Sequence, residues 1–167
     1  VNAIPAVADA GFNSVRLVWC ADNLKRAGRC TEKDMHSLQY LDSYLSHLAS
    51  ENLVAVLNLQ KATGSDDVNH LNLMVEYLTR DDVKCVLNNH RENLQINIAN
   101  EWYGTWVDEV DDNGFEGGEA WFDGYKEALT KLRGAGLKHQ FIIDTCGWGQ
   151  DPRCMLEFGD QLLAHDA

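Results

Sequence analysis

Four short apolar runs recur along the chain, at residues 14–19, 53–59, 94–98 and 140–144, with a helical pattern between each pair. The runs are rich in leucine or β-branched residues, a composition that favours buried strands. Strands that alternate with helices pair in parallel through right-handed crossovers, so this rhythm predicts an α/β fold. A spacing of about 40 residues per unit is compatible with either a closed barrel or an open sheet.

Capping residues indicate where the first helices begin. Residues 31–34 resemble a capping box with Asp in place of Glu, and they predict a helix that ends near Glu51. Residues 64–67 offer N-cap side chains for a second helix that carries Leu71, Val75 and Leu78. Residues 83–87 predict one or two further helical turns.

Two more helices are expected in the last third of the chain. The first follows the glycine pair at residues 117–118 and stops at the glycines of residues 134–136. The second follows Pro152, and its leucine pattern predicts three inward side chains. These are Leu156, Leu162 and Leu163. The acidic segment 108–119 between strand and helix reads as a solvated loop, because its aspartates do not match the spacing of a calcium loop.

Composition limits the classes of partner. At 167 residues the chain fits a single domain spanning residues 1–167, with a net charge of −12 that repels nucleic acid and anionic membranes. The sequence has no apolar run near the roughly 18 residues that span a bilayer. No Gly-x-Gly-x-x-Gly or Gly-Lys-Ser/Thr loop follows a strand, and no Gly-x-Ser-x-Gly elbow is present. We therefore expect no nucleotide cofactor, and a neutral substrate is the easiest to accept.

Five cysteines bear on location and metal binding. Cys20 and Cys30 flank one polar loop and Cys146 and Cys154 another, which suits two local disulfides in an exported protein, although four cysteines allow three pairings. Cys85 is expected to be a buried thiol. No cysteine pair has the separation of a structural zinc site, so no metal is predicted. The chain starts without Met or a signal segment, which indicates processing or excision from something longer.

Polar and aromatic residues follow every predicted strand, and the carboxyl ends of parallel strands meet on one face, where such folds place ligands. Glu101 follows the third run beside Asn100 and Trp102. A carboxylic acid with apolar neighbours is suited to protonate a glycosidic oxygen, and aromatic faces stack on sugar rings. Arg16, inside an apolar run, is expected to pair with Glu101.

The other candidate side chains carry open interpretations. Trp102, Trp106 and Trp148 either line a sugar-binding cleft or pack in the core or a lid. All six histidines fall in predicted helices or turns, so we expect them at the surface and outside the chemistry.

Several ordered motifs together resemble glycoside hydrolase family 5, and most of all its bacterial endo-β-1,4-mannanases. They are found at residues 12–18, 62–64, 96–106, 132–136 and 147–150. The resemblance implies a (β/α)8 barrel that hydrolyses internal β-mannosidic bonds with retention, outside the cell and without a cofactor. It implies Glu101 as general acid/base, Asn100 as its substrate-holding neighbour and Arg16 as a support. Trp102 and Trp148 would lie near the sugar subsites, with Trp106 as a further cleft candidate.

The chain departs from this pattern in two respects. Gln60 and Lys61 replace a His-Asp pair that such mannanases commonly carry, although Gln60 can still bond a sugar hydroxyl. A retaining enzyme also needs a nucleophilic carboxylate about 5 to 5.5 Å from the acid. The family's nucleophile would follow Ala167, so it is absent here. Asp144 is the one inward carboxylate to consider, and it matches no nucleophile motif.

These departures leave three hypotheses. The chain is expected to be a partial barrel of about strands 2 to 5, whose open edges need the missing half or another chain. Its substrate would be β-mannan or another β-1,4-glycan such as cellulose. A non-catalytic carbohydrate-binding module and an unrelated open-sheet protein are the alternatives.

Overall fold

The computed structural model describes residues 3–21, 35–109, 114 and 116–167, and its centre is a parallel sheet. The strands lie in the order β2-β1-β3-β4-β5. Their bounds are β1 Ser14–Ala21, β2 Met35–His36, β3 Val54–Leu59, β4 Leu94–Asn97 and β5 Gln140–Ile142. The four predicted strands are thus confirmed within one or two residues, and every pair is parallel, as the strand and helix rhythm predicts.

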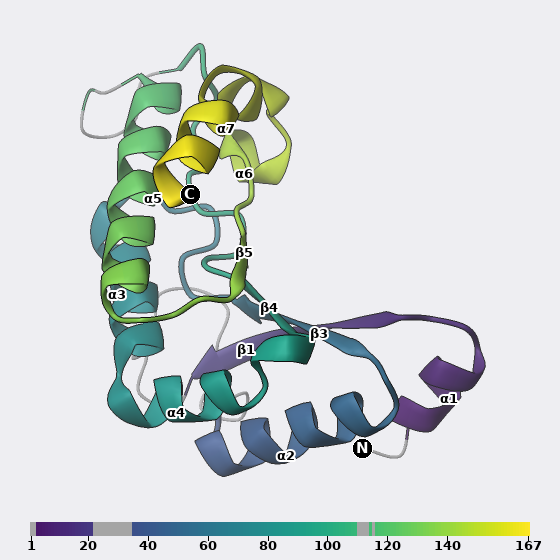
Figure 1. Cartoon of the computed structure of the whole chain (residues 1–167). Helices are drawn as coiled ribbons and strands as arrows, with labels where there is room; N and C mark the ends of the chain where they lie inside the picture. The colour runs from purple at the N-terminus through teal and green to yellow at the C-terminus, as the bar shows by residue number, and fades with distance from the viewer. Residues whose placement is uncertain (1–2, 22–34, 110–113, 115) are drawn as a thin grey trace.

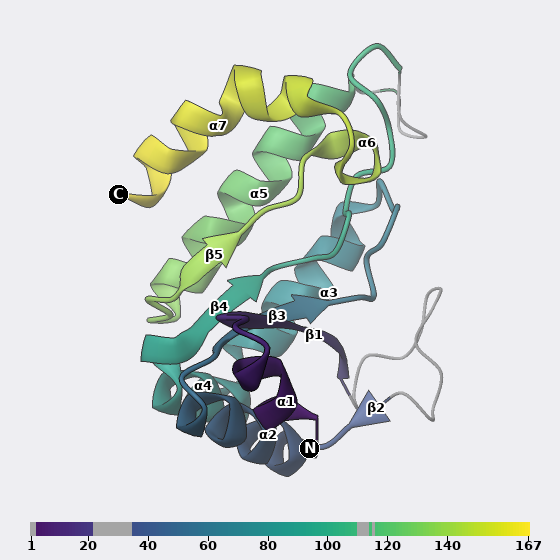
Figure 2. The same ribbon diagram turned by 90° about the vertical axis from the view of Figure 1, so that its right-hand side faces the viewer.

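Helices connect the strands, and α2 to α5 follow one side of the curved sheet (Figures 1 and 2). Their bounds are α1 Ile4–Asp9, α2 Leu38–Ser50, α3 Val68–Thr79, α4 Asp81–Asn89, α5 Gly117–Gly134, α6 Cys146–Gly149 and α7 Pro152–Asp166, with a 3₁₀ turn η2 at Arg91–Asn93. Helix α7 packs on α5. None of the helices in the described ranges could span a lipid bilayer.

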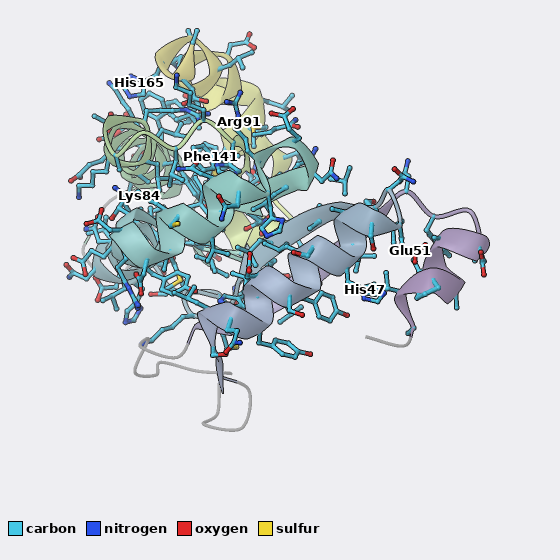
Figure 3. All side chains as sticks on the ribbon, turned by 60° about the horizontal axis from the view of Figure 1, so that its bottom comes forward. His47, Glu51, Lys84, Arg91, Phe141 and His165 are labelled. Carbon is cyan, nitrogen blue, oxygen red and sulfur yellow. A yellow bond between two sulfur atoms is a disulfide. The ribbon has the colours of Figure 1, made fainter. Side chains whose placement is uncertain are left out.

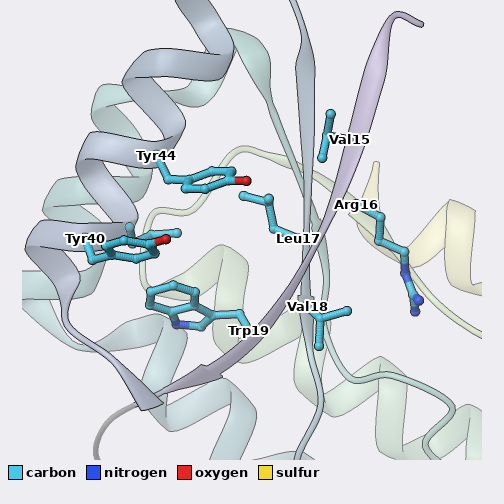
Figure 4. Close-up of a pocket in the computed structure, with 8 residues that line it drawn as sticks. Val15, Arg16, Leu17, Val18, Trp19, Tyr40 and Tyr44 are labelled. Carbon is cyan, nitrogen blue, oxygen red and sulfur yellow. The ribbon is translucent and has the colours of Figure 1, made fainter. Parts of the chain in front are cut away.

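The two faces of the sheet differ in chemistry. Leu57 and Ile96 are paired in register and fully buried on the side that the helices cover. Side chains one residue away point to the opposite, inner face. That face carries Arg16, and Figure 4 shows Arg16 and Val18 on the other side of β1 from Leu17, Tyr40 and Tyr44. The inner face is therefore the polar, open side of the sheet.

The predicted helices begin where the sequence indicates, except for α2. Asp67 caps α3 by accepting a hydrogen bond from the backbone of Asn69, as predicted. Helix α2 instead begins after Ser37, whose hydroxyl accepts from the Tyr40 backbone. The expected start at residues 31–34 is wrong, because strand β2 precedes this cap; residues 31–34 themselves lie outside the described residues.

Three burial predictions are also wrong. Of the three α7 leucines only Leu162 is inward, beside the buried Cys154 and Phe158. Leu156 and Leu163 are 83% and 72% exposed, because the helix turns that stripe away from α5. Cys85 is an exposed free thiol on α4. His139 is buried, since it directly precedes β5 at the bottom of the sheet and bonds the Leu87 carbonyl.

His165 is exposed on α7, as expected (Figure 3). It forms a hydrogen bond with Thr130 on the neighbouring α5. Cys146 and Cys154 form a disulfide, which confirms one predicted pairing. Cys20 is also disulfide-bonded, whereas Cys30 lies outside the described residues.

Candidate functional site

Three loops meet beyond the carboxyl ends of β3, β4 and β5. They comprise residues 60–67, 98–106 and 144–151. Figure 2 shows the three strands directed toward the side of the molecule where α6 lies. Parallel pairing forces these ends to one edge of the sheet, so the predicted convergence of the polar strand ends is observed.

Glu101 lies on a tight turn with a left-handed backbone, at φ 46°. The turn is attached to the loop after β3, because the Gly64 backbone donates to the Glu101 carbonyl at 2.8 Å. Next to it, the Asn100 backbone donates to the Leu59 carbonyl at 2.7 Å and the Tyr103 backbone to the Ser65 carbonyl at 3.0 Å. A left-handed conformation is costly for a non-glycine residue and persists when such bonds hold it.

Asn100 is buried just after β4 and uses both ends of its amide. Its oxygen accepts from the Arg16 guanidinium at 2.5 Å and from Asn58 at 3.4 Å. Its nitrogen donates to the Thr63 hydroxyl at 3.0 Å. Arg16 therefore bonds Asn100, and the expected pair with Glu101 is wrong in this structure. The reason is geometric. Arg16 lies on β1, which β3 separates from β4, so its side chain reaches only Asn100, the first residue of the turn.

Asp144, which lies just after β5, contacts the Glu101 turn. One carboxylate oxygen accepts from the Glu101 backbone N–H at 2.8 Å and the other from Asn97 Nδ2 at 2.8 Å. The Asp144 carbonyl accepts from Trp121 Nε1 at 3.0 Å. Both carboxylate oxygens are thus hydrogen-bonded within the site. Desolvation, together with the negative charge of Asp144, raises the pKa of the buried Tyr125 hydroxyl well above its usual range.

Trp102 does not line the open face, contrary to our expectation of a sugar-contacting ring. Its indole is fully buried and packs edge-on against Tyr103 and Tyr125. Its ring nitrogen donates to the Asp67 carbonyl at 3.2 Å. The ring fills the space above Gly124, where a Cβ would lie 2.3 Å from it. Trp102 is therefore a core residue that joins α3 and α5 behind the site.

Trp148 and Trp106 do stay partly exposed, at 41% and 38% of each residue. The Trp148 ring lies on Gly64, since a Cβ on that glycine would lie 2.1 Å from its atoms. The Trp106 ring lies against Gly147, where a Cβ would be 3.0 Å away. Both indoles thus pack against glycines while part of each residue stays exposed, as a surface that stacks on sugar rings requires.

The residues that replace the His-Asp pair follow β3. The Gln60 amide donates to the Asn58 side chain, so Gln60 belongs to the network of Asn100. Lys61 is buried, and desolvation lowers the pKa of its amine.

A clamp fixes the Trp148 loop. The Cys146–Cys154 disulfide ties the loop to α7. The buried Asp151 carboxylate accepts from the Val107 backbone and from the Arg153 side chain. Hydrogen bonds from Arg153 hold the pKa of Asp151 well below its usual range. Sequence reasoning missed Asp151, although an Asp before Pro at a helix start is the signal of an N-cap.

Comparisons with known proteins agree with one another. The family model described as "Cellulase (glycosyl hydrolase family 5)" matches residues 2–161. A mannan endo-1,4-beta-mannosidase of Salipaludibacillus agaradhaerens is 36% identical over 99% of this chain and 47% of its own length. One of Streptomyces lividans is 30% identical over 90% of this chain and 35% of its own length.

A solved structure gives the same result for the fold. The beta-mannanase of Thermomonospora fusca, in a mannohexaose complex, matches with a TM-score of 0.78 and 25% identity, over 99% of this chain and 51% of that one. The fold is therefore a partial (β/α)8 barrel, as the resemblance implied. The chain spans about half the length of the Salipaludibacillus relative.

Proposed function

Because the chain belongs to glycosyl hydrolase family 5, as its match over residues 2–161 shows, we propose that it carries the acid/base part of a retaining endo-β-1,4-mannanase. The observation that carries the proposal is Glu101 on its fixed left-handed turn, beside the Arg16–Asn100 bond at the carboxyl edge of the sheet. The mannosidase relative at 36% identity supports mannan as the substrate.

In this proposal Glu101 protonates the glycosidic oxygen as the bond breaks and then deprotonates the water that attacks the intermediate. In the same proposal, the nucleophile is supplied by the part of the relatives' length that this chain does not span. Asp144 is a poor nucleophile, because both of its oxygens accept hydrogen bonds from the turn and from Asn97. Trp148 and Trp106 would stack on sugar rings of β-mannan.

We further propose that the protein works outside the cell, where its Cys146–Cys154 disulfide would persist. The missing half of the barrel, or another chain, would complete the site.

The test is Glu101→Gln in the longest natural polypeptide that contains these residues. Loss of the acid/base group is expected to lower kcat on mannan by about 100-fold or more. Glu92→Gln, at an exposed glutamate on η2, is the matched control and should keep full activity. An unchanged rate for Glu101→Gln would refute the assignment.

The exposed rings of Trp148 and Trp106 also favour a second candidate, a sugar-binding module without catalysis. Calorimetry of the 167-residue chain with mannohexaose and cellohexaose separates the possibilities. Binding by a polypeptide that lacks hydrolysis supports the module, and the preferred hexasaccharide distinguishes mannan from glucan. No heat at millimolar ligand argues against it.

A further inference from the structure

Asp144 is the one carboxylate that contacts the Glu101 turn through a side-chain hydrogen bond in the described part of the chain. It lies just after β5, and its oxygens bridge two points of the neighbouring strand: Asn97, the last residue of β4, and the Glu101 backbone, four residues later. A bidentate bridge of this kind fixes the direction in which the chain leaves β4.

We propose that Asp144 is a positioning residue, which holds the Glu101 carboxyl in its working direction by anchoring the Glu101 N–H. This inference rests on the proposed function, because it concerns how the same acid/base is aimed. The Glu101 backbone has φ 46°, and its carbonyl is held by Gly64. Asp144 holds the other side of the same residue, so the two bonds together determine where the side chain leaves the turn.

The surroundings favour a geometric role over a chemical one. The Asp144 carbonyl is fixed by Trp121, so its backbone cannot shift easily. Gly149 lies next to both carboxylic side chains. A Cβ added to this glycine would lie 3.6 Å from Glu101 Cγ and 3.8 Å from Asp144 Cβ. Each Asp144 oxygen already accepts a charge-assisted hydrogen bond, which is stronger than a neutral one.

An unpartnered atom makes the role testable. Asn97 Oδ1 is buried and has no hydrogen-bond partner among the described residues. In Asp144→Asn, the new amide oxygen can accept from Glu101 N–H, and its nitrogen can donate to Asn97 Oδ1 after the Asn97 amide rotates. Asn therefore preserves both contacts without the charge, whereas Ala removes both.

The first measurement is hydrogen exchange of the Glu101 amide by NMR, in the protein and its two variants. Asp144→Ala is expected to accelerate exchange by about 10-fold, as the loss of one hydrogen bond of roughly 1.4 kcal/mol implies. Asp144→Asn should stay within about 2-fold of wild type. Asp160→Ala, an exposed aspartate on α7, is the control. Equal protection in Asp144→Ala would overturn the proposal.

The second measurement uses two substrates with the longer natural polypeptide. On mannohexaose, Asp144→Ala should lower kcat/KM by about 100-fold, because a misplacement of about 1 Å can cost that much. On 2,4-dinitrophenyl β-mannobioside it should lose less than about 10-fold, since that leaving group departs without a proton from the acid. A merely structural defect would lower both values together.

The outcomes separate the positioning role of Asp144 from the proposed mannanase function. Activity of Asp144→Asn near wild type supports positioning. An Asn variant as inactive as the Ala variant overturns it and assigns the charge itself to the chemistry. If the wild type cleaves neither substrate, the proposed function fails, while the exchange data still decide whether Asp144 anchors Glu101.

Discussion

Glu101 and Trp148 both hold left-handed backbone conformations, at φ 46° and 59°. Each such residue costs of order 1 kcal/mol or more, and the cost persists where the surrounding structure enforces it. The enforcing bonds come from different loops: Gly64 holds the Glu101 carbonyl, and the Tyr103 carbonyl accepts from the Trp148 backbone. Tyr103, in the same loop as Glu101, also has a positive φ, and Asn52 outside the site has one as well. Most of the left-handed non-glycine residues in the described ranges therefore lie in the loops of the candidate site, where backbone strain is commonly held.

Gly64 supports the Trp148 ring directly, which leads to a prediction for Gly64→Ala. A methyl group there would lie 2.1 Å from the ring, so the indole must move and mannohexaose affinity should fall by about 10-fold or more. Gly136→Ala is the matched control, because Gly136 has a similar positive φ and open space around it. Both variants should lose roughly 1 kcal/mol of stability from backbone strain. Calorimetry and thermal unfolding would check this, and equal affinities in the two variants would contradict it.

For the helices and strands, sequence patterns locate the elements well, but they predict poorly which face of an element is buried. The apolar runs place β3, β4 and β5 within two residues, because buried parallel strands are continuous hydrophobic segments. The start of α2 fails because an ordinary Ser37 cap replaces the more visible capping-box pattern upstream. Periodicity alone also cannot tell which neighbour a helix will have, so the leucine pattern of α7 wrongly predicts that its two exposed leucines point inward.

The candidate site shows the same limit. Glu101 and Asn100 are recognisable because they follow a strand, but Trp102 and Trp148 look alike in the sequence. One ring fills the space above Gly124 in the core, and the other lies half-exposed on Gly64. Those contacts join residues far apart in the chain, so no local pattern predicts them.

The Cys146–Cys154 disulfide ties α6 to α7 and should control both stability and binding. Replacing both cysteines by serine removes a short covalent loop, which is expected to cost about 2 to 3 kcal/mol. It should also weaken mannohexaose binding, because Trp148 lies inside that loop. Cys85→Ser, at the exposed free thiol, should change neither quantity. Urea unfolding and calorimetry test the prediction, and an unaltered unfolding midpoint in the double variant would refute it.

His139 should make stability depend on pH. Burial lowers the pKa of its imidazole in the folded protein below the usual value near 6.5. The unfolded chain then binds more protons between the two pKa values, so stability falls as pH drops below about 6.5. His139→Gln keeps a donor for the Leu87 carbonyl but does not titrate. The variant should therefore lack this part of the loss of folding stability at acidic pH. Urea midpoints from pH 5 to 7.5 would show it, with the exposed His165→Gln as control; parallel curves for wild type and His139→Gln would contradict it.

At the scale of the whole molecule, opposing surface properties predict how the 167-residue chain associates. Leu156 and Leu163 project from α7, and Val18 from the inner face of the sheet, and burial of this exposed apolar surface favours contact between copies. The net charge of −12 opposes contact between copies at low salt, while screening at higher ionic strength removes that repulsion.

We therefore expect the chain to be largely monomeric in about 10 mM salt and to self-associate above roughly 0.3 M, where the Debye length falls well below 10 Å. Changing Leu156 and Leu163 to glutamate should abolish this association without loss of folding, because neither side chain packs in the core. Sedimentation velocity across the salt series measures it, with a charge-matched control of Gln161→Glu and Ala164→Glu on the same exposed helix. If the control suppresses association equally, charge alone is responsible and the apolar stripe of α7 is not the contact surface.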